Sequence, residues 1–244
     1  MLESLSLAQL AYAATVIAVA YVVRGIAGFG SGLVSIPLLA LILPLPVVVP
    51  TISVLDYLAS VTHGTRNRHA IQWRDLLPLL PFTLAGVLSA LYLFKTVDAD
   101  LLRRALGVFI ILYALYSLRA AKPAGGGSRL WAAPAGGFGG LIGTLFGTGG
   151  PFYVIYMSLR GLEKTAFRAT IATVFMIDGG ARLTGYLASG FYGTKTLLLI
   201  ASGLPIMAAG LYVGGHIHTT ITQRRFQQAI GLLLIGSGVA LLVK

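Results

Sequence analysis

Long apolar segments without a charged residue recur along the whole chain, separated by short stretches rich in glycine, proline and basic residues. The segments cover 7–23, 33–55, 76–94, 106–118, 169–177, 197–215 and 229–243. Several approach the roughly 20 residues that a helix needs to cross the hydrocarbon core of a bilayer. The pattern therefore predicts an all-α, polytopic membrane protein.

The composition supports this interpretation. Of the 244 residues, 57% are hydrophobic and only 10% are charged, and the mean hydropathy is +0.87. Soluble domains average roughly a quarter charged residues, so this chain has too little polar surface to face water. The N-terminal segment lacks the basic region of a secretory signal, and we expect it to be retained in a multi-pass protein of the cell inner (plasma) membrane.

Charge and residue types exclude several functions. The net charge is +11, but the basic residues lie in short loops without interleaved aromatic residues, so we expect no nucleic-acid partner. The chain has no cysteine, and its four histidines lie at segment ends without acidic partners at ligand spacing, so we expect no metal or cofactor. We find no nucleophile–base constellation and expect no enzymatic activity.

The two halves of the chain match each other in order, at nearly constant spacing. Glycines of the first half recur 119 residues later, a threonine–aspartate set recurs at 122, and six further residues recur at 124. The matched residues are Gly28, Gly30, Thr51, Asp56, Pro81, Ala85, Gly86, Ala105, Gly107 and Ile111, with Gly147, Gly149, Thr173, Asp178, Pro205, Ala209, Gly210, Ala229, Gly231 and Ile235. We predict a first transmembrane repeat at 1–121, a cytoplasmic glycine-rich linker at 122–129, and a second repeat at 130–244.

Loop charges predict how the repeats are oriented. Most basic residues fall in the loops 65–74, 119–129, 160–168 and 219–225, which the positive-inside rule places in the cytoplasm. The first of these loops corresponds in the second half to 189–195, which carries one basic residue and is expected outside. The repeats are therefore predicted to be inverted, with both termini extracytoplasmic.

Each half offers five helical segments, and the second is short in both, at 32–44 and 150–159. We favour a glycine-tipped, re-entrant helical hairpin made from the first two segments, followed by three transmembrane helices. Five full crossings in each half would have the same parity, so loop charge leaves both arrangements open.

The predicted hairpin tips contain the densest glycine motifs. Glycine lets a backbone leave a helix and approach a ligand, and half-helices in inverted-repeat transporters direct their positive N-termini at anions. The alternative is that these glycines only let helices pack closely. We predict substrate binding by Arg24, Gly28, Gly30, Ser31, Gly32, Gly147, Thr148, Gly149 and Gly150, with Gly32 and Gly150 each preceding a half-helix.

These motifs resemble those of a known family. The sequence Gly28-Phe-Gly-Ser-Gly-Leu-Val-Ser-Ile-Pro-Leu38 is similar to the first glycine-rich signature of the sulfite exporter TauE/SafE family, and Gly147-Thr-Gly-Gly-Pro-Phe-Tyr-Val-Ile-Tyr156 to the second. The second copy departs from the usual pattern at Pro151 and Tyr156. The resemblance covers nearly the whole chain and implies transport, usually outward, of sulfite or organosulfur anions such as sulfonates.

Charged residues inside apolar segments are the remaining candidates, because such groups are costly in a membrane. Asp56 and Asp178 occupy equivalent positions and either carry a coupling proton or brace the tips. Arg182 follows Asp178 by four residues, which favours an ion pair within one helix. Arg24 either attracts an anion or extends to the cytoplasmic surface.

We therefore predict a secondary transporter of a small anion, working by alternating access around the glycine tips at the membrane midplane. Its expected partners are the anion, the lipid bilayer and a coupling proton. The alternative is an anion channel with a fixed filter lined by backbone groups.

Overall fold

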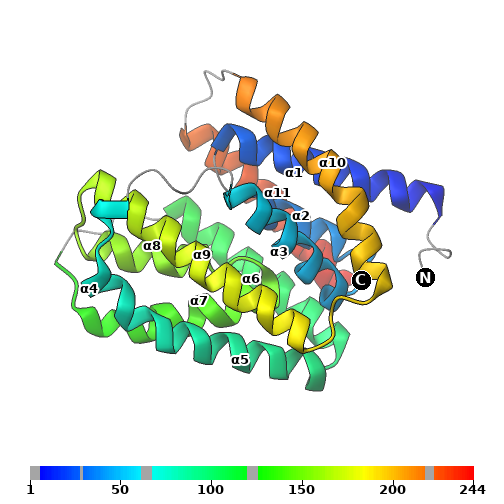
Figure 1. Ribbon diagram of the computed structural model, residues 1–244. Coiled ribbons are helices and arrows are strands. Elements are labelled where there is room, and N and C mark those ends of the chain that lie inside the picture. Colours follow the sequence, from blue (N-terminus) through cyan, green and yellow to red (C-terminus); the bar gives the residue numbers. More distant parts are fainter. Residues whose placement is uncertain (1–5, 28–29, 62–67, 120–125, 218–222) are drawn as a thin grey trace. The chain divides into compact units, whose positions relative to one another are not determined.

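The computed structural model describes residues 6–27, 30–61, 68–119, 126–217 and 223–244, so Gly28 lies outside the described residues. Within these ranges the chain is helical and contains no strand, which confirms the all-α prediction. The α-helices are α1 (Leu7–Ala27), α2 (Ser31–Leu39), α3 (Leu45–Val61), α4 (Trp73–Leu76), α5 (Leu80–Thr96), α6 (Ala99–Arg119), α7 (Ala132–Phe146), α8 (Gly150–Leu159), α9 (Lys164–Ala188), α10 (Thr194–His216) and α11 (Gln223–Val243) (Figure 1).

The helices form two compact units, and each unit takes helices from both sequence halves. Unit 1 comprises Met1–Asp56, Val97–Ala120 and Phe191–Lys244, and unit 2 comprises Tyr57–Thr96 and Ala121–Gly190. Unit 1 thus joins α1 and α2 of the first half with α10 of the second. Unit 2 joins α7 and α8 of the second half with α5 of the first.

In unit 1, α1 lies side by side with α10, and α6 with α11 (Figure 1). Glycines on α10 make the first contact possible, because a side chain on Gly214 would overlap the carbonyl oxygen of Val22. Between α6 and α11, a side chain on Gly107 would crowd the carbonyl oxygen of Gly238, and a side chain on Gly238 would crowd that of Gly107. Small residues at these positions let helix backbones approach closely, as in other membrane helix pairs.

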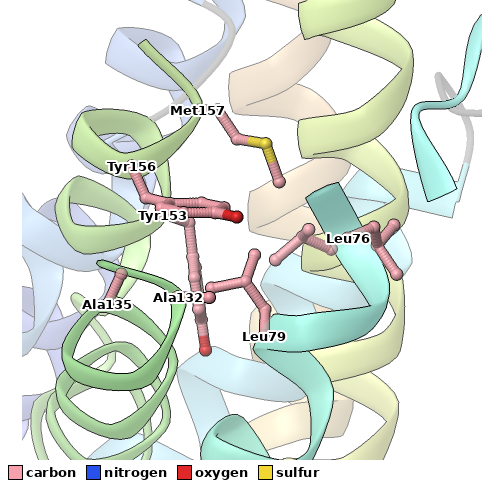
Figure 2. Packing of buried hydrophobic residues seen from close by; sticks show 8 residues of the cluster. Leu76, Leu79, Ala132, Ala135, Tyr153, Tyr156 and Met157 are labelled. Atoms are coloured by element: carbon pink, nitrogen blue, oxygen red, sulfur yellow. The ribbon is translucent and has the colours of Figure 1, made fainter. Parts of the chain in front are cut away.

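In unit 2, α5 lies side by side with α7, and the hairpin of α7 and α8 packs on the start of α5. Buried apolar side chains from α4, the helical turn before α5, α7, α8 and α9 form one core, shown in Figure 2: Leu76, Leu79, Ala132, Ala135, Tyr153, Tyr156, Met157 and Val174. Tyr153 and Met157 are fully buried there. Lipid tails are as apolar as these side chains, so burial in the protein gains little from the hydrophobic effect. Burial of large apolar side chains therefore stabilises such a hairpin through van der Waals packing.

One helix contact recurs in both units at equivalent sequence positions. A side chain on Gly86 of α5 would meet the carbonyl oxygen of Gly137 and the amide of Leu141 on α7. A side chain on Gly210 of α10 would meet the same atoms of Ala18 and Val22 on α1. Gly86 and Gly210 are 124 residues apart, and the two partner positions are each 119 apart, which are the spacings of the sequence repeat.

The short helices α2 and α8 each fold back along the helix before them. Leu159 at the end of α8 accepts hydrogen bonds from the amides of Gly126 and Gly127, which precede α7. The end of α8 therefore lies beside the start of α7. In the first half, the Tyr12 hydroxyl near the start of α1 donates to the Leu38 carbonyl near the end of α2, at 3.2 Å.

Three described helical segments are long and apolar enough to cross a membrane by length and composition: Leu7–Ile26, Trp73–Thr96 and Thr194–His216. The helix α9 has 25 residues but carries Asp178 and Arg182 in its middle. At about 1.5 Å rise per residue, α9 is also longer than the roughly 30 Å hydrocarbon core.

Candidate anion site at the two hairpin tips

Gly30 occupies the turn that begins α2 in the first tip. Its φ is 98° and its ψ is 1°, in the left-handed region that side chains with a Cβ avoid. The helix starts at Ser31, so Gly32 lies within its first turn and does not precede it as the sequence predicted. The helix α2 therefore begins one to two residues earlier than the glycine motif alone suggested.

Asp56 on α3 receives three side-chain donors at this tip. Its Oδ1 accepts from the Ser31 hydroxyl at 2.6 Å and from the Tyr21 hydroxyl at 2.7 Å, and it pairs with Arg24 Nη1 at 2.8 Å. The same Arg24 nitrogen donates to Ser31 Oγ at 2.9 Å. Arg24 therefore joins the first residue of α2 to Asp56.

The second tip is built differently. Gly147 ends α7 with φ 65°, and its amide donates to the Gly143 carbonyl at 2.9 Å. Gly149 is the residue before α8 and has ordinary helical angles, φ −68° and ψ −17°. Glycine is therefore needed here because a side chain would not fit, and not because of the backbone conformation. A Cβ on Gly149 would overlap the carbonyl oxygen of Gly139 on α7. Gly150 begins α8, as the sequence predicted to within one residue.

Thr148, between those glycines, is 3% exposed. No residue that the structure describes forms a hydrogen bond with its Oγ1. A buried hydroxyl without a partner is uncommon and costs free energy unless a ligand or water satisfies it. This hydroxyl lies next to the N-terminus of a ten-residue helix.

Asp178 on α9 is the counterpart of Asp56 and is 1% exposed. Its Oδ2 pairs with Arg182 Nη2 at 3.1 Å, which confirms the predicted ion pair within one helix. The Tyr153 hydroxyl of α8 donates to Asp178 Oδ1 at 3.1 Å. Arg182 Nη1 also donates to the Gly143 carbonyl at 2.8 Å, beside the second tip.

Both tips thus contain a helix N-terminus, an aspartate, an arginine and a tyrosine. The aspartates and Arg24 were predicted from the sequence, whereas Tyr21 and Tyr153 were not. Their signal in the sequence is weak, because the two tyrosines do not occupy equivalent repeat positions. Tyr21 is on α1, the first helix of its hairpin, and Tyr153 is on α8, the second helix of the other hairpin. In the described part of the chain, no three His, Asp or Glu side chains gather as a metal site would require.

A third charged cluster holds the other end of unit 2 together. Asp75 of α4 is 5% exposed and accepts from Arg129 Nε and Arg160 Nε, each at 2.9 Å. The hydrogen bond from Arg129 to Asp75 and the charge of Asp75 raise the pKa of Arg129. The cluster brings together three of the loops that loop charge assigned to one side of the membrane.

Comparison with known proteins agrees with these features. The sequence model of the family described as "Sulfite exporter TauE/SafE" matches residues 13–241. A protein of Comamonas testosteroni named "Probable inner membrane transporter protein TsaS" is 28% identical to the chain over 191 residues, which cover 77% of this chain and 79% of the relative. No solved structure matches the chain. The chain is a membrane transporter that belongs to the sulfite exporter TauE/SafE family.

Proposed function

We propose that this protein is a secondary transporter that exports sulfite or an organosulfur anion such as a sulfonate, by alternating access around its two hairpin tips. One observation carries the proposal. At each tip a short helix begins at a glycine turn, and an arginine–aspartate pair lies beside that turn: Arg24 with Asp56, and Arg182 with Asp178.

The tips suit an anion for electrostatic reasons. The N-terminus of a helix presents unpaired amides and a positive partial charge, and arginine adds donors in a planar fork. An anion that leaves water loses its hydration, and these groups replace it without several full positive charges in the membrane. The aspartate keeps each arginine neutralised when no anion is bound.

The lengths of α2 and α8 favour a site near the membrane midplane. They have nine and ten residues, so each spans about 14 Å, which is half of a roughly 30 Å hydrocarbon core. Because each short helix returns alongside the helix before it, the two form re-entrant hairpins in this proposal. The three other long helices of each half then cross the membrane.

We also infer that the two halves are inverted in the inner membrane, with both termini extracytoplasmic. Two observations support this. The equivalent contacts made by Gly86 and Gly210 fit a duplicated architecture. Asp75 gathers three basic loops at one end of unit 2, as a shared cytoplasmic side requires. The repeats remain 1–121 and 130–244, joined by the 122–129 linker, although the compact units mix their helices.

Charge balance makes a proton the preferred coupling ion. A neutral arginine–aspartate pair that takes up a monovalent anion gains a net charge of −1 inside the membrane. Protonation of Asp56 or Asp178 returns the site to neutrality and frees the guanidinium to face the anion. In this scheme the anion and the proton bind together, and the tyrosine hydroxyls stabilise whichever aspartate remains ionised.

Purified protein in proteoliposomes tests the proposal. We would measure flux of sulfite, sulfate, thiosulfate, sulfoacetate and taurine, with and without a pH gradient. We expect the flux of sulfite or a sulfonate to saturate. Unlabelled substrate on the opposite side of the membrane should accelerate this flux. Flux that never saturates and shows no such exchange would favour the anion channel, and no flux of any of these compounds would contradict both.

A further inference from the structure

A guanidinium lies at both hairpin tips, although it comes from a different helix in each. At the first tip, Arg24 extends from α1, the arm of the hairpin, and donates to Ser31. At the second, Arg182 extends from α9 and donates to the Gly143 carbonyl on the hairpin arm α7. The two side chains are similarly enclosed, 13% and 16% exposed.

The repeat spacing shows that the arginine has changed position between the halves. At the spacing of 119 residues that relates the tips, the counterpart of Arg24 is Gly143. At the spacing of 122 that relates Asp56 to Asp178, the counterpart of Arg182 is Ser60. Each half therefore has one arginine at its tip and a small residue where the other half has its arginine.

Space at the second tip matches this exchange. A Cβ built on Gly143 would lie 3.7 Å from Arg182 Nη1 and 3.4 Å from the α-carbon of Gly149. The guanidinium of Arg182 thus lies in van der Waals contact with the point where a side chain at position 143 would begin. An ion pair that served α9 alone would not need this placement, since residues four apart on a helix meet on its surface anywhere along it.

We propose that Arg182 is the anion-binding arginine of the second tip, the counterpart of Arg24. Each compact unit then holds its own anion-binding group, made of a helix N-terminus, a hydroxyl from Ser31 or Thr148, and an arginine with its aspartate. This inference rests on the proposed function, in which the tips bind the substrate.

The chemistry of the anion-binding group at the second tip narrows the class of ligand. A guanidinium offers parallel donors that match two oxygens of one group, and the buried Thr148 hydroxyl and the α8 amides add further donors. Such a donor set fits an oxyanion with at least two exposed oxygens, as in sulfite and the sulfonate group. Asp178 pairs with this guanidinium and balances its charge, and the Tyr153 hydroxyl donates to the same carboxylate.

Relocating the arginine tests the proposal. The variants are Arg182→Ser, Arg182→Lys, and the double variant Gly143→Arg with Arg182→Ser, which moves the guanidinium to the position it has in the first half. Arg103→Ser is the control, because the Arg103 side chain is similarly enclosed, 18% exposed, and pairs with Asp100 on its own helix α6. For each we would measure the KM of sulfite or sulfonate flux and the thermal stability of the purified protein, with and without the anion.

We expect at least a tenfold rise in KM for Arg182→Ser, a smaller rise for Arg182→Lys, and recovery of at least a third of the lost affinity in the double variant. Arg103→Ser should leave KM unchanged. Should Arg182→Ser fail to fold, Arg182→Lys carries the test, because it retains the charge opposite Asp178 but loses the fork. A wild-type KM in Arg182→Ser or in Arg182→Lys would overturn this inference alone. Wild-type protein that neither transports nor binds any of the anions would overturn the proposed function as well.

Discussion

Gly149 lies against Gly139 across the second hairpin, so closely that a side chain on Gly149 would overlap the carbonyl oxygen of Gly139. Gly149→Ala should therefore push α8 away from α7 and move the amides at the tip. Overpacking of this kind costs about 1–3 kcal/mol. We expect at least a tenfold loss of transport per folded molecule and a lower melting temperature. Gly137→Ala on α7 is the matched control, since a side chain there would meet nothing within 4 Å; equal losses in the two variants would contradict this account.

Gly30 requires glycine for a different reason. A Cβ at Gly30 would meet nothing within 4 Å, but its φ of 98° strains any other residue. Valine there should cost about 1–2 kcal/mol and distort the start of α2, whereas asparagine enters the left-handed region more readily. We expect Gly30→Val to abolish transport and Gly30→Asn to retain part of it. Gly236→Val on α11, where space is open, should be nearly neutral in the same flux assay.

Most of the helices and of their ends were predictable from the sequence, because apolar runs and glycine motifs act locally. The second segments of both halves, for example, were recognised as short, and α8 has the predicted bounds of 150–159. The bounds of α2 differ from the predicted 32–44. The helix starts at Ser31 because the left-handed turn is at Gly30, and a motif with three nearby glycines does not indicate which of them adopts that conformation. It ends at Leu39, where turns replace the helix before Pro44, so the apolar run continues beyond the helix.

The contacts between distant segments were not predictable in the same way. Asp75 had no evident role in the sequence, because its partners Arg129 and Arg160 are 54 and 85 residues away. The sequence also favoured a simple helical ion pair for Arg182, and the pair is present. Its contact with Gly143 depends on how α9 packs against α7, which no local pattern encodes.

Asp75 should stabilise unit 2 rather than contribute to transport. Removing one partner of a buried pair costs about 3–5 kcal/mol, and the partial exposure of Arg129 should reduce this to about 1–3 kcal/mol for Asp75→Ala. Arg160→Ala should destabilise more than Arg129→Ala, because their side chains are 19% and 48% exposed. Thermal unfolding in detergent measures this order. Asp100→Asn, at an exposed acid, should change the melting temperature little, and substrate KM should stay constant throughout.

Asp56→Asn and Asp178→Asn separate proton coupling from bracing. Asparagine can still accept a hydrogen bond from Tyr21 or Tyr153 but cannot exchange a proton. If these aspartates carry the coupling proton, anion accumulation driven by a pH gradient should disappear while exchange of anion for anion persists. Flux measured at several internal and external pH values gives the result. Loss of the folded protein would indicate bracing instead, and unchanged pH dependence in both variants would remove the aspartates from coupling.

The inverted arrangement makes a specific demand on α9, which must cross the membrane with Glu163 on the cytoplasmic side and Thr194 outside. Both side chains are exposed and lie just beyond the ends of the segment 164–193. The natural chain has no cysteine, so single variants Glu163→Cys and Thr194→Cys can be labelled without background. A membrane-impermeant maleimide applied to intact cells should label only Thr194→Cys, and opened cells should label both. Ser128→Cys should behave like Glu163→Cys, because the Asp75 cluster holds their two loops together. Labelling of Glu163→Cys and Thr194→Cys from the same side would mean that α9 does not cross, and the two repeats would then not be inverted.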